Sequence, residues 1–275
     1  HLVSERESGV AALIDPVLDF DGASGRIWTD SVDAFLADIS SRSIRLKYVF
    51  ETHIHADHLT AAAYVGAKTG ARIIASAATP RTQALFEAVY DIRCPGNSFD
   101  YLLNDGETLP LGALTLKAVA TPGHTISCMT LLIEDCAFVG DTLFMPEYGT
   151  PRCDFPGGDA STLFASIQKL YALPDHIRLF SAHDYLAPGR DHFAWESTIK
   201  EHREHNIHLR CDTSRDAFIS MRKARDAKLN APKLMLPAVQ VNICGGRLPR
   251  PHKNGTHYLQ LPLAPPKNGI PGVTT

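Results

Sequence analysis

Long apolar runs are absent from this sequence, and none approaches the roughly 20 consecutive apolar residues that a membrane helix needs. We recognise no secretory signal peptide in the residues given, and we expect no membrane partner and a cytoplasmic location. A large charge of one sign is also lacking, since the net charge is only −3. Such a balance argues against nucleic acid or a membrane surface as a partner.

The six cysteines include no C-x-x-C pair, and 275 residues are many for a disulfide scaffold. We therefore expect buried or free thiols in a reducing compartment.

Low-complexity segments, solenoid repeats and obvious linkers are missing too. This predicts one domain over residues 1–275, with residues 230–275 as an irregular C-terminal segment packed on it. The chain opens at His1 without a methionine, which leaves its native N-terminus and any targeting segment open.

Hydrophobic spacing alternates between helical and extended periods along the chain. Val32, Phe35 and Ile39 repeat with helical spacing, Asp159 suits a helix N-cap and Gly70 suits a helix end. Strands dominate from residue 99 to residue 144. The mixed order favours an α/β (α+β) fold in which two sheets pack together with helices outside. We predict a hairpin over residues 1–17, strands over 44–50, 71–76, 114–120, 127–133, 136–141 and 177–183, and helices over 28–43, 59–70, 80–90, 159–173, 195–209 and 214–229.

The stretch ETHIHADHLT, residues 51–60, crowds four metal-capable side chains together directly after an apolar strand. These are His53, His55, Asp57 and His58. Neutral imidazole and carboxylate groups suit zinc, iron and manganese. The four side chains cannot all point one way from a strand or a helix. We therefore predict a tight loop that turns two of them toward one metal position and two toward a neighbouring one.

Three further metal-capable residues, His124, Asp141 and His183, each stand just past the end of an apolar strand. Strand ends of one sandwich can converge on a single rim, where rigid strands hold the loops that carry chemistry. The sequence therefore predicts a metal site at that rim. His124 and His183 could complete the two positions, and the two oxygens of Asp141 could bridge them.

The remaining histidines are expected to be structural or on the surface. Among them, His202, His205 and His208 lie at helical spacing and could imitate a ligand face. They stand among Glu201, Arg203 and Glu204, so the sequence predicts a solvated helix there.

The motifs THIHADH, TPGHT, GDTLF and SAHDY resemble those of the metallo-β-lactamase superfamily, and the resemblance covers nearly the whole chain. HADH, AHDY and the run TPRCDFPGGDA are most similar to the persulfide dioxygenases, a branch that includes the bacterial β-lactamase hydrolase-like proteins. The segment FMPEYG is slightly longer than in the animal and plant members. The resemblance also implies that another strand residue or two, and a short leader, precede His1. The resemblance implies a four-layer αβ/βα sandwich with the metal site at one edge.

The resemblance further implies one Fe(II) per chain, held by His53, His124 and Asp141. Such a 2-His-1-carboxylate set leaves three open positions for substrate sulfur, O₂ and water. The implied reaction oxidises glutathione persulfide with O₂ to sulfite and a thiol. The partners would then be small molecules, not nucleic acid or a membrane.

In this interpretation the other polar residues support the site. Tyr185 would donate a hydrogen bond into it, and Arg152 would pair with a carboxylate of the substrate. The outer polar shell, which orients water and the metal ligands, would consist of His55, Asp57, His58 and His183.

A dinuclear zinc thioester hydrolase of the glyoxalase II type stays open as the alternative. It would bind one or two Zn(II) ions per chain and activate water near neutral pH. One metal would be held by His53, His55 and His124, the other by Asp57, His58 and His183, with Asp141 bridging. For either activity a homodimer through the C-terminal helices is a further expectation.

Overall fold

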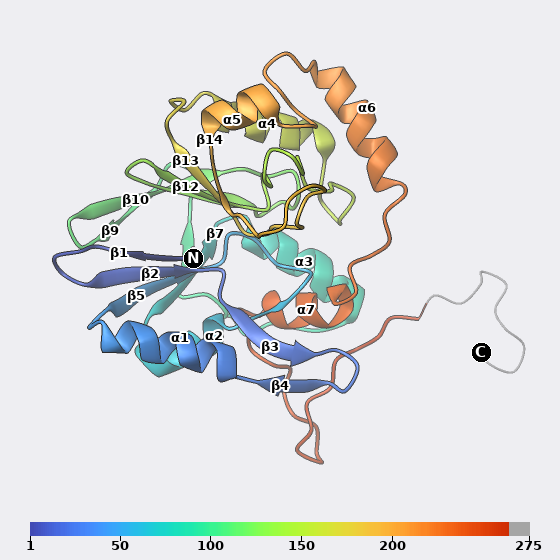
Figure 1. Cartoon of the computed structure of the whole chain (residues 1–275). Helices are drawn as coiled ribbons and strands as arrows, with labels where there is room; N and C mark the ends of the chain where they lie inside the picture. Colours follow the sequence, from blue (N-terminus) through green and yellow to red (C-terminus); the bar gives the residue numbers. More distant parts are fainter. Residues whose placement is uncertain (264–275) are drawn as a thin grey trace, which may run out of the picture.

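The computed structural model describes residues 1–263, and the last part of the predicted C-terminal segment, residues 264–275, lies outside the described residues. Two β-sheets lie face to face, and helices cover the outer side of each (Figure 1). This arrangement confirms the predicted four-layer αβ/βα sandwich. No helix in residues 1–263 is long and apolar enough to cross a membrane.

The first sheet is built from the N-terminal half of the chain. In sheet order its strands are β1 (Leu2–Ser4), β2 (Val10–Ile14), β5 (Arg45–Phe50), β7 (Arg72–Ser76) and β8 (Tyr101–Leu103). The predicted hairpin pairs β1 with β2, and the other neighbours run parallel. Parallel strands need crossover connections, and the helices α1 (Asp30–Ser41), α2 (Ala62–Thr69) and α3 (Thr79–Tyr90) lie in these connections.

The second sheet brings three of the predicted ligand positions to one edge. Its order is β14 (Glu196–Thr198), β13 (Arg178–Ser181), β12 (Cys136–Gly140), β11 (Met129–Ile133), β10 (Leu114–Ala120) and β9 (Thr108–Leu111). β10, β11 and β12 alternate in direction, and β12 is parallel to β13. β10, β12 and β13 therefore end at the same edge, and His124, Asp141 and His183 follow these three ends.

Apolar side chains fill the space between the two sheets. Ile14, Phe50 and Ile74 from the first sheet and Leu116 and Leu131 from the second are fully buried in one cluster. Burying such a side chain stabilises the fold by about 1.5–3 kcal/mol. This packed layer fixes the strand ends that carry the candidate site.

Two predicted helix boundaries are confirmed. The Asp159 carboxylate accepts the backbone N–H of Thr162 at 2.7 Å and starts α4 (Ala160–Tyr171). Gly70 ends α2 in the left-handed conformation, at φ 73°. With α5 (Ile199–His205) and α6 (Arg215–Asp226), α4 covers the second sheet (Figure 1).

Two predictions about the C-terminal half need correction. The helix expected over residues 195–209 is only α5, because Glu196–Thr198 pair with β13 and Thr198 caps the helix in a capping box with Glu201. The tail is not irregular throughout, since α7 (Met235–Asn242) packs against α3 and the short strand β6 (Leu59–Thr60). β6 also joins β3 (Val17–Asp21) and β4 (Arg26–Trp28) in a small sheet that the sequence did not predict.

The expectations for the cysteines and for the helix histidines are partly wrong. Cys94 and Cys244 form a disulfide, which spacing alone could not indicate because the two residues are 150 positions apart. His202 is fully buried and bonded to Ser197 and Asn206. His208 is buried as well and lies beyond the end of α5. Of these three histidines, only His205 is exposed to solvent.

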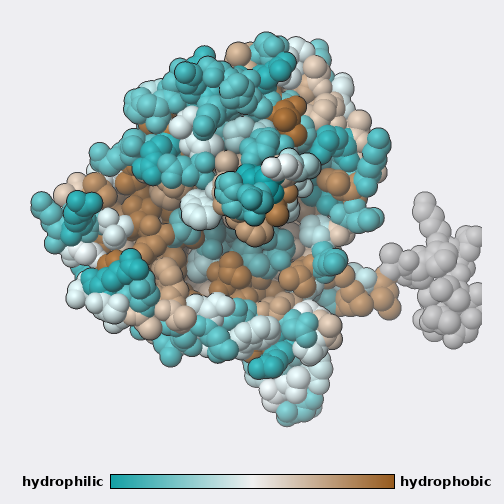
Figure 2. Space-filling view, in the orientation of Figure 1, coloured by the Kyte–Doolittle hydropathy of each residue, from teal (hydrophilic) through white to brown (hydrophobic). Residues whose placement is uncertain are grey.

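Apolar surface gathers around α7 and the segment that follows it, as Figure 2 shows. Leu236, Leu248 and Leu261 are exposed there. The outer surface over α5 and α6 is mostly polar in the same view.

Candidate metal centre

The loop after β5 approaches the end of β12 closely, and two residues make this approach possible. Asp15 follows β2 in the left-handed conformation, and its carboxylate accepts the N–H and the hydroxyl of Thr52, both at 2.7 Å. Gly140 is the second, because a Cβ there would lie 2.4 Å from Thr52 Oγ1. Together they bring His53 next to Asp141.

His53, His124 and Asp141 form one of three groups of possible ligands among the described residues, and the ligand atoms of each group lie within 4.8 Å of one another. The Oδ2 atom of Asp141 lies 3.8 Å from His53 Nε2 and 3.7 Å from His124 Nε2. All three residues are buried. These are the three residues that the family resemblance implies for a single metal.

Hydrogen bonds fix the ring orientation of both histidines. His124 donates from Nδ1 to the Arg152 carbonyl at 2.8 Å. Thr52 gives its hydroxyl proton to Asp15, so its oxygen accepts the Nδ1–H of His53 at 3.1 Å. Both Nε2 lone pairs are therefore free for a metal ion. Burial, with His55 and His124 nearby, lowers the pKa of His53, which keeps the ring neutral.

His55 belongs to the other two groups of possible ligands, one with Asp57 and His58 and one with the buried carboxylates of Asp15 and Glu51. Its Nε2 lies 3.0 Å from Asp15 Oδ1 and 3.9 Å from Glu51 Oε2. Burial opposes its charge, but these carboxylates outweigh that effect and raise the pKa of His55 to about 10. Burial also raises the pKa of Glu51, to about 8. The sequence analysis missed both carboxylates: Asp15 stands far from the stretch of residues 51–60, and Glu51 opens that stretch but was not counted among its metal-capable residues.

Asp57, His58 and His183 form a second group beside the first. His183 Nε2 lies 3.1 Å from Asp57 Oδ2 and 3.6 Å from Asp141 Oδ1, and His58 Nδ1 lies 3.4 Å from the same Asp57 oxygen. The seven predicted side chains therefore gather at one edge of the sandwich.

Buried atoms without partners show that these residues fit a metal. Within residues 1–263, no hydrogen-bond partner is found for His58 Nε2, His183 Nε2 or Asp141 Oδ1. Buried polar atoms are normally paired, so such a concentration of free donors and acceptors is typical of a metal site. Nitrogen and oxygen donors without a thiolate suit iron, zinc or manganese.

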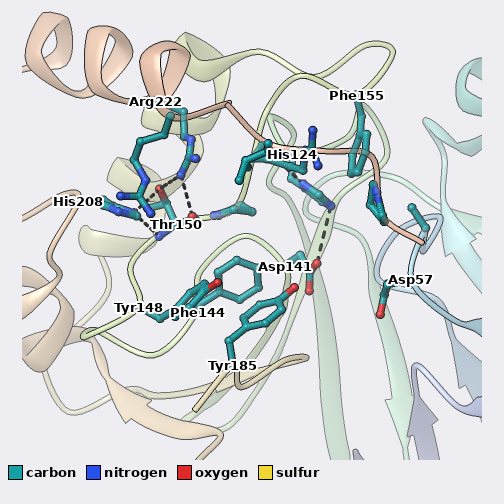
Figure 3. Close-up of a pocket in the computed structure, with 16 residues that line it drawn as sticks. Asp57, His124, Asp141, Phe144, Tyr148, Thr150, Phe155, Tyr185, His208 and Arg222 are labelled. Carbon is teal, nitrogen blue, oxygen red and sulfur yellow. Dashed lines mark hydrogen bonds and ion pairs between the residues drawn. The ribbon is translucent and has the colours of Figure 1, made fainter. Parts of the chain in front are cut away.

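A cavity of about 350 Å³ opens in front of Asp57, His124 and Asp141. Figure 3 shows aromatic side chains, Phe144, Tyr148 and Tyr185, between this end and a polar far end with His208 and Arg222.

Tyr185 lines the cavity, and in Figure 3 its hydroxyl end points toward Asp141. Its ring stacks on Tyr148 with centroids 4.6 Å apart. Burial, then the Asp141 and Asp57 carboxylates, raises the pKa of Tyr185, so the hydroxyl keeps its proton.

Arg152 also lines the cavity, but its guanidinium is engaged within the protein. It pairs with both oxygens of Asp154, at 2.6 and 2.7 Å, and donates to the Asn230 carbonyl at 2.7 Å. The substrate pairing predicted for Arg152 would have to displace these contacts. Arg225 lines the same cavity and is exposed, and its guanidinium has no ion pair or hydrogen bond within the described part of the chain.

His208 is a second cavity residue that the sequence analysis missed. Its Nδ1 accepts the backbone N–H of Thr150 at 2.9 Å. Burial, with Arg225 and Arg222 nearby, lowers the pKa of His208 to about 4, so the neutral ring carries its proton on Nε2. That buried Nε2 has no partner among the described residues. Nothing in the sequence distinguishes His208 from His202 and His205, which repeat with it at helical spacing.

The model of the metallo-β-lactamase superfamily matches residues 3–183, and the chain belongs to that superfamily. It is a superfamily of metal-binding enzymes whose fold this structure shares. The homologues include persulfide dioxygenases and β-lactamase hydrolase-like proteins, as the family resemblance predicted.

Three relatives illustrate the range of similarity. A "probable metallo-hydrolase" of Burkholderia pseudomallei is 46% identical over 277 residues, covering 96% of this chain and 94% of that protein. A "Beta-lactamase hydrolase-like protein" of Agrobacterium fabrum is 45% identical over 96% of this chain, which spans only 61% of that protein's length. The mitochondrial "Persulfide dioxygenase ETHE1" of Bos taurus is 34% identical, covering 85% of this chain and 77% of its own.

A solved structure agrees with these relatives. ETHE1 from Myxococcus xanthus superposes with a TM-score of 0.72 at 30% identity, over 90% of this chain and 93% of the other.

Proposed function

We propose that this chain is an Fe(II)-dependent persulfide dioxygenase, with one iron per chain and glutathione persulfide as its substrate. The observation that carries the proposal is the compact group formed by His53, His124 and Asp141, while His55 pairs with Asp15. Two histidines and one carboxylate with open positions are typical of non-heme Fe(II) oxygenases. Homology to persulfide dioxygenases supports the same assignment.

The balanced reaction joins a persulfide, O₂ and water to give a thiolate, sulfite and two protons (R–S–S⁻ + O₂ + H₂O → R–S⁻ + SO₃²⁻ + 2 H⁺). A bound Fe(II) would supply a redox-active ion that passes electrons from the persulfide sulfur to O₂, which is otherwise kinetically inert toward a closed-shell persulfide. His53 and His124 hold their Nε2 atoms toward the metal position because each Nδ1–H is already bonded. Asp57 and His183 orient water beside it, and the Tyr185 hydroxyl donates toward the same end of the cavity.

The far end of the cavity supports a substrate with an anionic group. Arg225 offers a guanidinium and His208 offers an Nε2–H, both without partners among the described residues. A glutathione carboxylate could accept from both, with the persulfide sulfur at the Asp141 end. Arg225 thus takes the role that the sequence analysis gave to Arg152.

A dinuclear zinc thioester hydrolase is the second candidate, and one observation favours it. His58 Nε2, His183 Nε2 and Asp141 Oδ1 are buried without hydrogen-bond partners among the described residues and could hold a second ion. The similarity to a "probable metallo-hydrolase" agrees with this alternative.

Two parallel assays separate the candidates. The protein is loaded anaerobically with Fe(II), given glutathione persulfide, and followed by O₂ uptake and sulfite formation. A zinc-loaded sample receives S-lactoylglutathione. Sulfite formation without thioester cleavage supports the dioxygenase, whereas thioester cleavage without O₂ uptake would replace it with the hydrolase. The homodimer and the cytoplasmic location stay predictions.

A further inference from the structure

The metal-binding loop, residues 53–58, has almost no backbone hydrogen bonds of its own. β5 ends at Phe50 and β6 begins at Leu59. Between them, within the described chain, residues 53–58 form no hydrogen bond with another backbone group. Buried backbone groups require partners, and a loop without them lacks a fixed conformation. Four of the seven metal-site residues depend on the conformation of this loop.

Asn242, the last residue of α7, supplies partners for two of these backbone groups. Its Nδ2 donates to the carbonyl of His55 at 2.8 Å and to the carbonyl of His58 at 2.7 Å. Its Oδ1 accepts the backbone N–H of Thr60 at 2.9 Å. The residue is buried, and one carboxamide therefore holds the loop at two points and the following strand β6 at a third.

We propose that Asn242 is a positioning residue of the metal centre: its carboxamide sets the conformation of the loop of residues 53–58, and so places His53 at the metal position with Asp57 and His58 beside it. It contacts neither substrate nor metal and acts only through the two carbonyls. The inference goes beyond the proposed function, because either candidate reaction needs the loop in this conformation.

The surroundings of Asn242 hold it firmly in place. The disulfide between Cys94 and Cys244 ties the end of α7 to the segment after α3. Gln83 Nε2 donates to the Ile243 carbonyl at 2.7 Å. Gly246 approaches β6 so closely that an added Cβ would lie 3.0 Å from the Thr60 carbonyl oxygen. These contacts fix the end of α7 against the metal-binding loop, although the two segments are far apart in the sequence.

The test uses Asn242→Asp, which keeps the shape and the acceptor but replaces both donors with an oxygen that repels the two carbonyls. Metal-free protein is titrated with Co(II), and the affinity and the visible absorption spectrum are recorded without substrate. We expect affinity to fall about 10- to 100-fold, the usual effect of removing a partner that orients a metal site. The Co(II) spectrum should change too. Iron-loaded variant should lose kcat at an unchanged KM, since the far end of the cavity is intact.

Gln240→Ala is the matched control. Gln240 is an equally buried amide on α7, but its side chain bonds to Leu236 and Gln260 and not to the loop. It should lower the melting temperature and leave the Co(II) affinity and spectrum unchanged. If Asn242→Asp does not fold, Asn242→Ser replaces it, because its hydroxyl is too short to reach both carbonyls. Wild-type Co(II) affinity and spectrum in a folded Asn242 variant would overturn the proposal, whatever reaction the enzyme catalyses.

Discussion

The Nε2 atom of His183 lies 3.1 Å from the Oδ2 atom of Asp57. This ion pair connects the end of β13 in the second sheet to the metal-binding loop, residues 53–58, which follows β5 in the first sheet. It lies beside the group formed by His53, His124 and Asp141 and does not belong to it. The proposed single-metal enzyme uses this pair to orient water, whereas a two-metal hydrolase would need both residues as ligands.

His183→Ala separates these two roles. We expect the variant to retain one iron per chain, because its three ligands are untouched, and to lose about 10- to 100-fold in kcat. Metal analysis after dialysis and O₂ uptake measure the two quantities. Loss of half of a two-metal complement would show instead that His183 is a ligand.

His124→Ala should abolish metal retention. The substitution removes one of only three direct ligands, and an open two-ligand site cannot compete with a chelator. Iron per chain is counted after dialysis against a mild chelator. His205→Ala is the control, because His205 is an exposed histidine on α5 and should change nothing. Full iron content in this variant would show that His124 is not a metal ligand.

Arg225→Gln should raise KM for glutathione persulfide with little change in kcat. A hydrogen bond to a charged group contributes about 1.5–3 kcal/mol, which corresponds to about a 10- to 100-fold rise. Arg210→Gln, which alters an exposed arginine outside the cavity, serves as the control. An unchanged KM would exclude Arg225 from substrate binding.

Acid should destabilise the fold through His202. Burial lowers the pKa of His202 from 6.5 to about 3, so the folded protein keeps the ring neutral while the unfolded chain takes up a proton first. Its effect on stability is therefore absent above about pH 6.5 and grows as the pH falls toward 3, by up to about 1.4 kcal/mol per pH unit.

Urea unfolding at several pH values from 7 to 4 measures this effect. His202→Gln should show a shallower loss of stability over that range than the wild type. His205→Gln should follow the wild-type curve, since that side chain is exposed. Equal slopes for all three proteins would contradict the burial argument.

The location of the metal site at one rim of the sandwich could be predicted, because apolar strands are easily recognised in the sequence. Asp141 and His183 follow such strands directly, and parallel strand ends must share an edge. The histidine loop was also recognisable, because four metal-capable residues rarely stand within six positions unless they bind a metal. The fold and the position of the seven side chains could therefore be predicted.

Residues that act through long-range contacts could not be predicted. Asn242 and Arg225 carry no motif, and only the packing of α7 and α6 brings them to the loop and the cavity. Arg152 stands in a recognisable motif, but its pairing with Asp154 depends on side-chain conformation. The helix over residues 235–242 was not predicted either, because it is stabilised by tertiary packing that buries Ala238, Val239 and Val241.

The most direct test of the single-metal dioxygenase is an anaerobic titration of metal-free protein with Fe(II). At each addition, a sample receives glutathione persulfide and O₂, and the sulfite formed is measured. We predict that activity rises in proportion to iron and stops rising at one Fe(II) per chain. A plateau at two ions per chain, or no sulfite at any iron content, would contradict the proposal.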